Sequence, residues 1–184
     1  MLKQITKKHI LALLSLIDKQ LSFDVTLVSL GGTALTLLDN KEFSLDIDVI
    51  MGPAEKQAEF DEIYFKTIKQ MKINPGEHPP FTAFDMGLLN IEDFLKKADL
   101  VKSTRFKHIT LYTMHIVDIL LSKNFRGHDK DIEDISNVFK KRKLTKKDIQ
   151  VRYIELLKQQ DYDVRSMFEK KYQEFLTNFG RLLT

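Results

Sequence analysis

Apolar and polar residues alternate in two different ways along the chain, and the change between them predicts two parts. Up to about residue 112, short apolar runs that suit strands alternate with stretches whose apolar residues recur every three to four positions. The first part is predicted to hold helices over 4–21, 33–38 and 54–72 and strands over 25–30, 45–51, 81–86 and 105–111. This order favours an α+β fold with a small mixed β-sheet and helices in residues 1–112.

Residues 113–184 show only the helical spacing, so they are predicted to form a helical C-terminal region packed on the core. The expected helices cover 114–123, 131–140, a segment that begins after Thr145, and 163–183. Thr145 is the predicted N-cap of its helix because Asp148 follows three residues later. Between two of these helices lies a run of basic residues over 140–147, which is either a solvated turn or a salt-sensitive contact with RNA or another nucleic acid.

The composition narrows the classes of protein without choosing one. Of the 184 residues, 43% are hydrophobic, which is enough for a core, and the net charge of +3 does not by itself indicate nucleic-acid binding. The absence of cysteine excludes disulfides and thiolate metal sites and suits a reducing compartment, so we expect a cytoplasmic location. No apolar run reaches the roughly 18 residues of a membrane span, and no membrane partner is expected. The apolar segment 10–17 is predicted to be an amphipathic helix rather than a signal peptide.

The densest chemical signal is a pair of glycines followed by two closely spaced aspartates. Gly31, Gly32 and Thr33 end one predicted strand and open a short helix, and Asp46 and Asp48 lie two positions apart on the next predicted strand. Side chains at i and i+2 of a strand share a face. Two carboxylates on an otherwise apolar strand are costly unless they bind something positive, and oxygen ligands suit Mg²⁺ or Mn²⁺. The pattern predicts a metal site beside a glycine turn that can approach a phosphate.

A second polar cluster spans 123–135. Asp131 and Asp134 share one face of a predicted helix, and the carboxylates near its start favour the helix dipole. One interpretation is therefore a well-capped helix with a solvated charged face. The other gives Lys123, which ends the preceding helix, the role of a lysine that faces a phosphate.

Together the two clusters resemble the DNA polymerase β-type nucleotidyltransferase superfamily, and in particular its abortive-infection toxin-like (AbiEii-like) branch and related uncharacterised proteins. The family pattern is a strand leading into Gly-Gly-Ser/Thr-Ala-Leu, then Asp-x-Asp, and later a lysine followed by Lys/Arg-Asp-x-x-Asp. The chain supplies these motifs as 31–35, 46–48, Lys123 and 130–135, so the resemblance runs from about residue 25 to residue 137.

The resemblance implies a metal-dependent transfer of NMP from an NTP to an RNA, protein or small-molecule acceptor. Asp46 and Asp48 would bind two Mg²⁺ (or Mn²⁺) ions, with Asp85 as the third ligand and a possible general base, or Asp99 in its place. The nucleotide phosphates would be bound by the residues of the glycine motif and of the second cluster: Gly31, Gly32, Thr33, Lys123, Lys130, Asp131 and Asp134. In a second interpretation, Asp131 and Asp134 orient Lys123 or Arg126, or contact the acceptor.

Two departures from the family pattern keep an alternative open. The arginine that often precedes the first aspartate is absent from 42–45, and His128 stands where an arginine is common before the Lys-Asp pair. The alternative is a catalytically degenerate binding protein with the same fold, such as the partner of an antitoxin.

Overall fold

The computed structural model describes residues 4–52, 54–73, 96–102, 105–160 and 162–184. These residues form two compact units, one from the described residues up to Met114 and one from His115 onward. The predicted strand over 81–86 lies outside the described residues, and so does Asp85.

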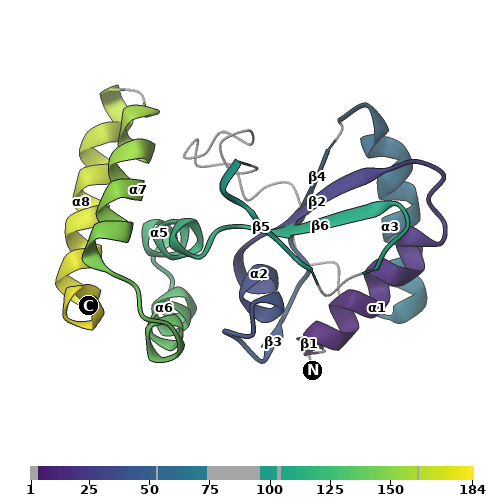
Figure 1. Ribbon diagram of the computed structural model, residues 1–184, viewed down its shortest axis with the longest axis horizontal. Coiled ribbons are helices and arrows are strands. Elements are labelled where there is room, and N and C mark those ends of the chain that lie inside the picture. The colour runs from purple at the N-terminus through teal and green to yellow at the C-terminus, as the bar shows by residue number, and fades with distance from the viewer. Residues whose placement is uncertain (1–3, 53, 74–95, 103–104, 161) are drawn as a thin grey trace. The chain divides into compact units, whose positions relative to one another are not determined.

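The first unit is built around a mixed four-stranded sheet (Figure 1). Its strands lie in the order β4-β2-β6-β5, with β2 parallel to β6 and antiparallel to β4. A separate two-stranded pair joins β1 to β3. The strands are β1 (Ile5–Thr6), β2 (Val25–Ser29), β3 (Phe43–Ser44), β4 (Val49–Gly52), β5 (Asp99–Leu100) and β6 (Ile109–Thr113). The helical elements among the described residues are α1 (Lys7–Asp18), α2 (Gly31–Leu37), the short 3-10 helix η1 (Ala54–Lys56) and α3 (Gln57–Met71).

The core of this unit follows from the alternation along the strands. Every second residue of the three longer strands faces one side, where α1 and α3 lie next to each other (Figure 1). Val25 and Leu27 of β2 are at most 2% exposed and pair across the sheet with Ile109, Met51 and Leu111, which belong to the same cluster. Burial of these side chains contributes about 1.5–3 kcal/mol each, so this face holds the unit together.

The ends of several elements differ from the sequence prediction because backbone groups find other partners. Ile5 and Thr6 were expected in a helix, but they pair with Ser44 and Phe43, so α1 begins at Lys7. The strand expected over 105–111 begins only at Ile109 and continues to Thr113.

Asp18 explains the late start of β6. This carboxylate ends α1 and accepts three backbone N–H bonds from the chain that enters β6, from Lys107 (2.9 Å), His108 (2.7 Å) and Ile109 (3.0 Å). Burial opposes ionisation, but the three N–H donors and the nearby His108 outweigh it, so the pKa of Asp18 is lowered. The carboxylate therefore fixes the end of α1 to the start of the strand beside β2.

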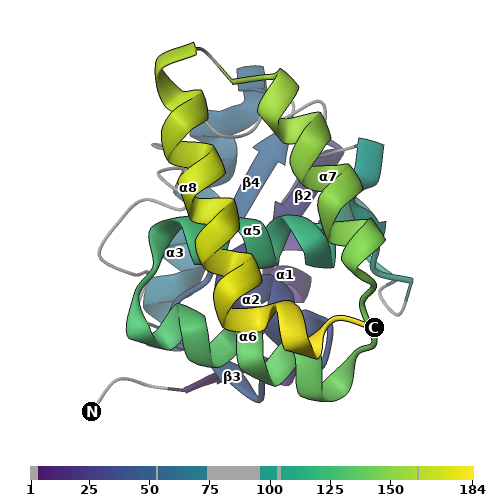
Figure 2. The same ribbon diagram turned by 90° about the vertical axis from the view of Figure 1, so that its left-hand side faces the viewer.

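The second unit is helical. Its elements are α5 (Ile116–Arg126), α6 (Asp129–Lys141), α7 (Lys146–Lys158), α8 (Tyr162–Phe179) and the 3-10 turn η3 (Gly180–Leu182). α5 is buried along most of its length and contacts α6, α7 and α8, and α7 and α8 lie next to each other (Figure 2). Asp118 of α5 and Arg152 of α7 form a buried ion pair, with Nε 2.5 Å from Oδ1.

The predicted fold class, a small mixed sheet with helices followed by a helical region, is confirmed. Thr145 is the N-cap of α7, and Asp148 completes the predicted capping box. Among the described residues, no helix is long and apolar enough to cross a membrane.

We predict that Asp18→Asn lowers the free energy of unfolding by about 2–3 kcal/mol. The amide has one acceptor oxygen, so at least one of the three backbone N–H groups of 107–109 loses its partner, and the remaining bonds weaken because the acceptor is no longer charged. Urea unfolding measures this loss. Asp39→Asn is the matched control, because the Asp39 side chain is exposed and its ion pair with Lys7 lies at the surface. Equal midpoints for the two variants would contradict the assigned role.

Candidate functional site

The glycine motif forms the first turn of α2 rather than a turn that precedes it. α2 begins at Gly31, whose φ of 48° lies in the left-handed region that favours glycine. A Cβ on Gly31 would lie 3.4 Å from Oδ2 of Asp48, and a Cβ on Gly32 would lie 2.8 Å from Oγ of Ser44. The two glycines therefore allow the segment that carries the aspartates to pack closely on this turn.

Thr33 fixes the same segment through its hydroxyl. Its Oγ1 donates to the carbonyl of Asp46 (3.2 Å) and accepts the backbone N–H of Asp48 (2.9 Å). The hydroxyl is fully buried, so it has no water to exchange for these partners. Thr33 thus holds the backbone on both sides of Ile47.

The predicted strand over 45–51 was wrong at its start, since β4 begins at Val49. Backbone groups of 46–48 bond mainly to side chains instead of a neighbouring strand: Thr33 takes two of them, and the hydroxyl of Tyr64 donates to the carbonyl of Ile47 (3.1 Å). The backbone carbonyl of Asp48 still accepts from Leu30. Asp46 and Asp48 therefore lie on a clamped segment just before the strand.

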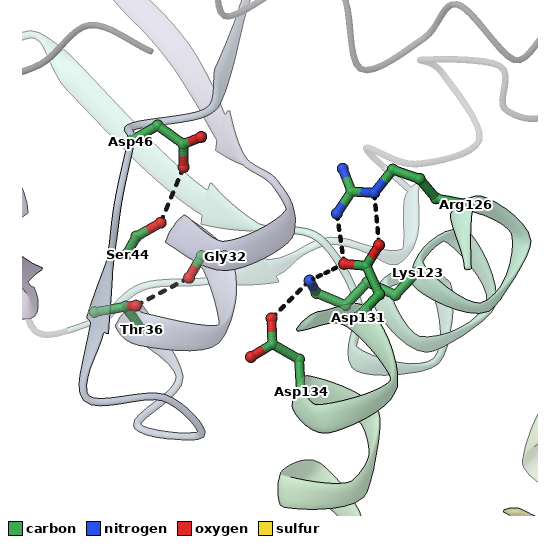
Figure 3. A network of polar contacts seen from close by, with 8 residues as sticks. All are labelled: Gly32, Thr36, Ser44, Asp46, Lys123, Arg126, Asp131 and Asp134. Carbon is green, nitrogen blue, oxygen red and sulfur yellow. Dashed lines mark hydrogen bonds and ion pairs between the residues drawn. The ribbon is translucent and has the colours of Figure 1, made fainter. Parts of the chain in front are cut away.

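The alternation predicted for this segment is retained. Ile47 is fully buried, whereas Asp46 and Asp48 are both partly exposed. The hydroxyl of Ser44 donates to Oδ1 of Asp46 at 3.1 Å and so orients that carboxylate (Figure 3). Two acidic side chains thus reach partly exposed positions on either side of one buried residue.

Tyr64 lies next to the aspartate segment, because its hydroxyl donates to the carbonyl of Ile47 (3.1 Å). Burial raises the pKa of Tyr64, and the negative charges of Asp48, Asp46 and Asp61 raise it further. Since the hydroxyl stays protonated, it remains a donor to the carbonyl of Ile47. Two partly exposed carboxylates just before β4 create a negative local field that attracts a cation.

The donor set fits a hard divalent cation. Carboxylate oxygen is the ligand that Mg²⁺ and Mn²⁺ prefer, and Mg²⁺ is commonly bound by one or two carboxylates, with water and substrate phosphates filling the other positions. Asp46 and Asp48 meet that need. Among the described residues no group of three acidic, histidine or cysteine side chains comes together, so any further ligand comes from elsewhere.

The third carboxylate is not part of the described site. Asp85 lies outside the described residues. Asp99 is exposed on β5, which is separated from β4 by β2 and β6, a distance of about 14 Å at the usual strand spacing. A single ion cannot bridge that gap between Asp99 and Asp48. The strand on the other side of β2, β6, carries no acidic residue over 109–113.

The second cluster is a buried ion-pair network in the helical unit (Figure 3). Nζ of Lys123 is 2.8 Å from Oδ1 of Asp131 and 2.7 Å from Oδ2 of Asp134, and these three side chains are at most 8% exposed. Arg126, about half exposed, donates to both oxygens of Asp131. The interpretation of Asp131 and Asp134 as a solvated face was therefore wrong.

The network has no net charge, because its two cations, Lys123 and Arg126, match its two carboxylates. Burial would raise the pKa of Asp131, but its hydrogen bonds and charge interactions with Arg126 and Lys123 lower that pKa to about 2. The contacts favour the interpretation in which Asp131 and Asp134 orient Lys123 and Arg126. Lys130, the remaining predicted residue of the cluster, is exposed on α6.

Comparison with known proteins identifies the family to which the chain belongs. A family model described as "Nucleotidyltransferase of unknown function (DUF6036)" matches residues 8–181. The chain belongs to this family. The match spans both units and includes the glycine motif, Asp46, Asp48 and the Lys123 cluster. No curated protein and no solved structure matches the chain. The nucleotidyltransferase family predicted from the motifs is thus confirmed, and it implies an NTP as substrate, whereas the toxin-like branch stays a prediction.

Sequence reasoning missed two residues that shape the site of this family member. Ser44 orients Asp46, and Tyr64 holds the carbonyl of Ile47 from α3. Ser44 stands only two residues before Asp46, so the sequence itself could have suggested a hydrogen bond between the two side chains. Tyr64 gives no such signal, because it meets Ile47 only through the packing of α3.

We predict that Gly32→Ala destabilises the protein by about 1–2 kcal/mol. The added methyl group reaches the Oγ of Ser44, so the hydroxyl must rotate away from Asp46 or the backbone must shift. Thermal or urea unfolding measures the loss. Gly52→Ala is the matched control, since its Cβ would meet nothing within 4 Å.

A double variant sharpens this test. In a Ser44→Ala background the contacting oxygen is gone, so Gly32→Ala should cost clearly less than it does in the unmodified chain. An equal cost in both backgrounds would show that the close contact between Gly32 and Ser44 does not determine the effect.

We also predict an acid-sensitive contribution from Asp131. Its folded pKa is below the unfolded value of about 3.9, so its stabilisation is fully present above about pH 5 and is lost as the pH falls through about 2. A shift of this size corresponds to about 2 kcal/mol. Urea unfolding between pH 5 and pH 2.5 should show a smaller pH dependence in Asp131→Asn than in the unmodified chain. Asp129→Asn, an exposed change on the same helix, should keep the full dependence.

Proposed function

We propose that the protein is a metal-dependent nucleotidyltransferase that transfers NMP from an NTP, and that Asp46 and Asp48 bind the metal. The observation that supports this most is the clamp by Thr33, which ties the aspartate segment to the glycine turn of α2. A packing role alone needs no pair of partly exposed carboxylates at this place. Family membership supplies the reaction class.

Each residue of the clamp has a part in this proposal. Gly31 and Gly32 let the segment that carries Asp46 and Asp48 pack closely on the first turn of α2, so the carboxylates lie beside the glycine motif. Thr33 and Tyr64 act as positioning residues that fix the backbone of 46–48. Ser44 holds one carboxylate oxygen of Asp46 and leaves the other for a ligand.

The metal would be held by Asp46 and Asp48. When bound, Mg²⁺ or Mn²⁺ supplies Lewis-acid stabilisation of the charge that develops on the triphosphate. The protein's own contribution is to hold both carboxylates on one rigid segment, so that little ordering is needed when the nucleotide binds.

A second function has its own supporting observations. β6 carries no acidic residue, and Lys123 is enclosed by Asp131 and Asp134. Two candidate metal-binding carboxylates, the number found in the described part of the site, suit nucleotide binding without transfer, as in a degenerate member of the family. Which function is right also decides the partners. Transfer needs an acceptor, which would be RNA, protein or a small molecule, whereas a degenerate protein of the toxin-like branch would bind an antitoxin partner.

We predict that each NTP that binds does so only with Mg²⁺ or Mn²⁺, and that Asp46→Asn with Asp48→Asn weakens binding at least about tenfold, which corresponds to about 1.4 kcal/mol. The reason is that amides bind divalent cations far more weakly than carboxylates do. Isothermal titration calorimetry of the full chain with each NTP, with and without metal, measures the effect.

The matched control removes two carboxylate charges elsewhere. Glu55→Gln with Glu62→Gln changes exposed residues of η1 and α3 and should leave NTP affinity unchanged. Binding that survives Asp46→Asn with Asp48→Asn, or that needs no metal, would contradict the site. Incubation with NTP labelled in the α-phosphate then separates the two functions, since label transferred to RNA or protein requires turnover.

A further inference from the structure

The positive charge of the protein is concentrated in its last seventy residues. Residues 1–114 contain fourteen basic and fifteen acidic residues, whereas residues 115–184 contain fifteen basic and eleven acidic ones. Three of the cations in the second set lie in ion pairs with buried carboxylates, namely Lys123, Arg126 and Arg152. The excess charge must therefore lie on the surface.

Six of these basic residues lie within the eight positions 140–147. The structure places them at the end of α6, in the connection after it and in the first turn of α7. Lys143, Lys146 and Lys147 are exposed. Among the described residues, neither Lys143 nor Lys146 forms an ion pair with a carboxylate. We call residues 140–147 the basic connection.

The basic connection is held in a defined conformation. Thr145 caps α7 in a reciprocal pair with Asp148, and the backbone N–H of Thr184 donates to the carbonyl of Leu144 (3.2 Å). The C-terminal segment therefore lies next to the connection. A fixed backbone lowers the entropy lost when the lysines engage a ligand.

Folding accounts for only part of this arrangement, since Lys147 attracts the carboxylate of Asp148 in the same turn of α7. Lys140 and Lys141 suit the C-terminal end of α6, where the helix dipole favours cations. Lys146 and Lys147 occupy the first turn of α7, where the dipole disfavours them, and six like charges within eight positions repel one another. An anionic ligand removes both penalties.

We propose that the basic connection is a binding surface for the phosphodiester backbone of a nucleic acid. Five of its six cations are lysines, which act as mobile point charges and suit a row of phosphates. Six cations within eight positions match the closely spaced charges of a phosphodiester strand, where each neutralised phosphate releases counterions. The inference concerns the helical unit alone and does not depend on nucleotide transfer.

Fluorescence anisotropy of the full chain with a labelled 20-nucleotide RNA, and with a DNA of the same sequence, tests the surface. The buffer contains a chelator and no NTP, so the readout is independent of the metal site. We expect affinity to fall steeply with salt, and Lys143→Gln with Lys146→Gln and Lys147→Gln to weaken binding by about tenfold or more at 0.1 M salt. The slope of log affinity against log salt should become shallower by about 2, because each of the three lost lysine–phosphate contacts with a single strand contributes about 0.7 to the slope.

The control variant removes three exposed lysines elsewhere, Lys66, Lys69 and Lys158, with the same change in net charge. It should bind like the unmodified chain. Circular dichroism establishes that each variant is folded. Preference for RNA or DNA identifies the natural strand. The proposal is overturned by no binding at 0.05 M salt, by equal losses in both lysine variants, or by equal affinity for poly-glutamate or anionic lipid vesicles.

Discussion

The hydroxyl of Thr33 is the contact on which the site depends most. One buried oxygen donates to the carbonyl of Asp46 and accepts from the N–H of Asp48, so it replaces the strand partner that these backbone groups lack. Without it, two polar groups beside the fully buried Ile47 would lose their partners, at about 1–3 kcal/mol each. Because Thr33 belongs to the first turn of α2, the position of the carboxylates follows the position of that helix.

The sheet and the two glycines also fix the position of the segment that carries Asp46 and Asp48. β2 leads directly into α2, and its neighbour β4 begins where the clamped segment ends, so both halves of the site are fixed at one end of adjacent strands. Asp18 fixes the start of β6 on the other side of β2. Close packing at Gly32, where even a Cβ would lie 2.8 Å from Ser44, leaves little freedom for the segment to move. Rigid placement of charged side chains is what binding of a metal and a triphosphate requires.

The sequence predicted what local spacing determines. Periodicity predicted the strand β2 and the helix α3, and the spacing of Thr145 and Asp148 predicted the cap of α7. The resemblance of the short motifs predicted the nucleotidyltransferase family. Element ends were missed where tertiary partners capture the backbone, as Asp18 does at 107–109 and as β3 does at Ile5 and Thr6. In the candidate site, the motif residues were found, but Tyr64 was not, because its bond to Ile47 spans seventeen positions and depends on how α3 packs. Burial of Asp131 and Asp134 was missed for the same reason, since sequence shows a charge but not its neighbours.

The helical unit contains two kinds of cation: buried ones that pair with carboxylates, and exposed ones that are concentrated in the basic connection. Where the cations Lys123 and Arg152 are buried, each meets carboxylates at 2.5–2.8 Å, because an unpaired charge there would cost several kcal/mol. Such pairs specify how α5 packs against α6 and α7 but leave no net charge to attract a ligand. The basic connection is the opposite case, since its cations are concentrated where the start of α7 disfavours them. Attraction between Lys147 and Asp148 offsets part of this cost, and the proposed phosphodiester ligand would offset the rest.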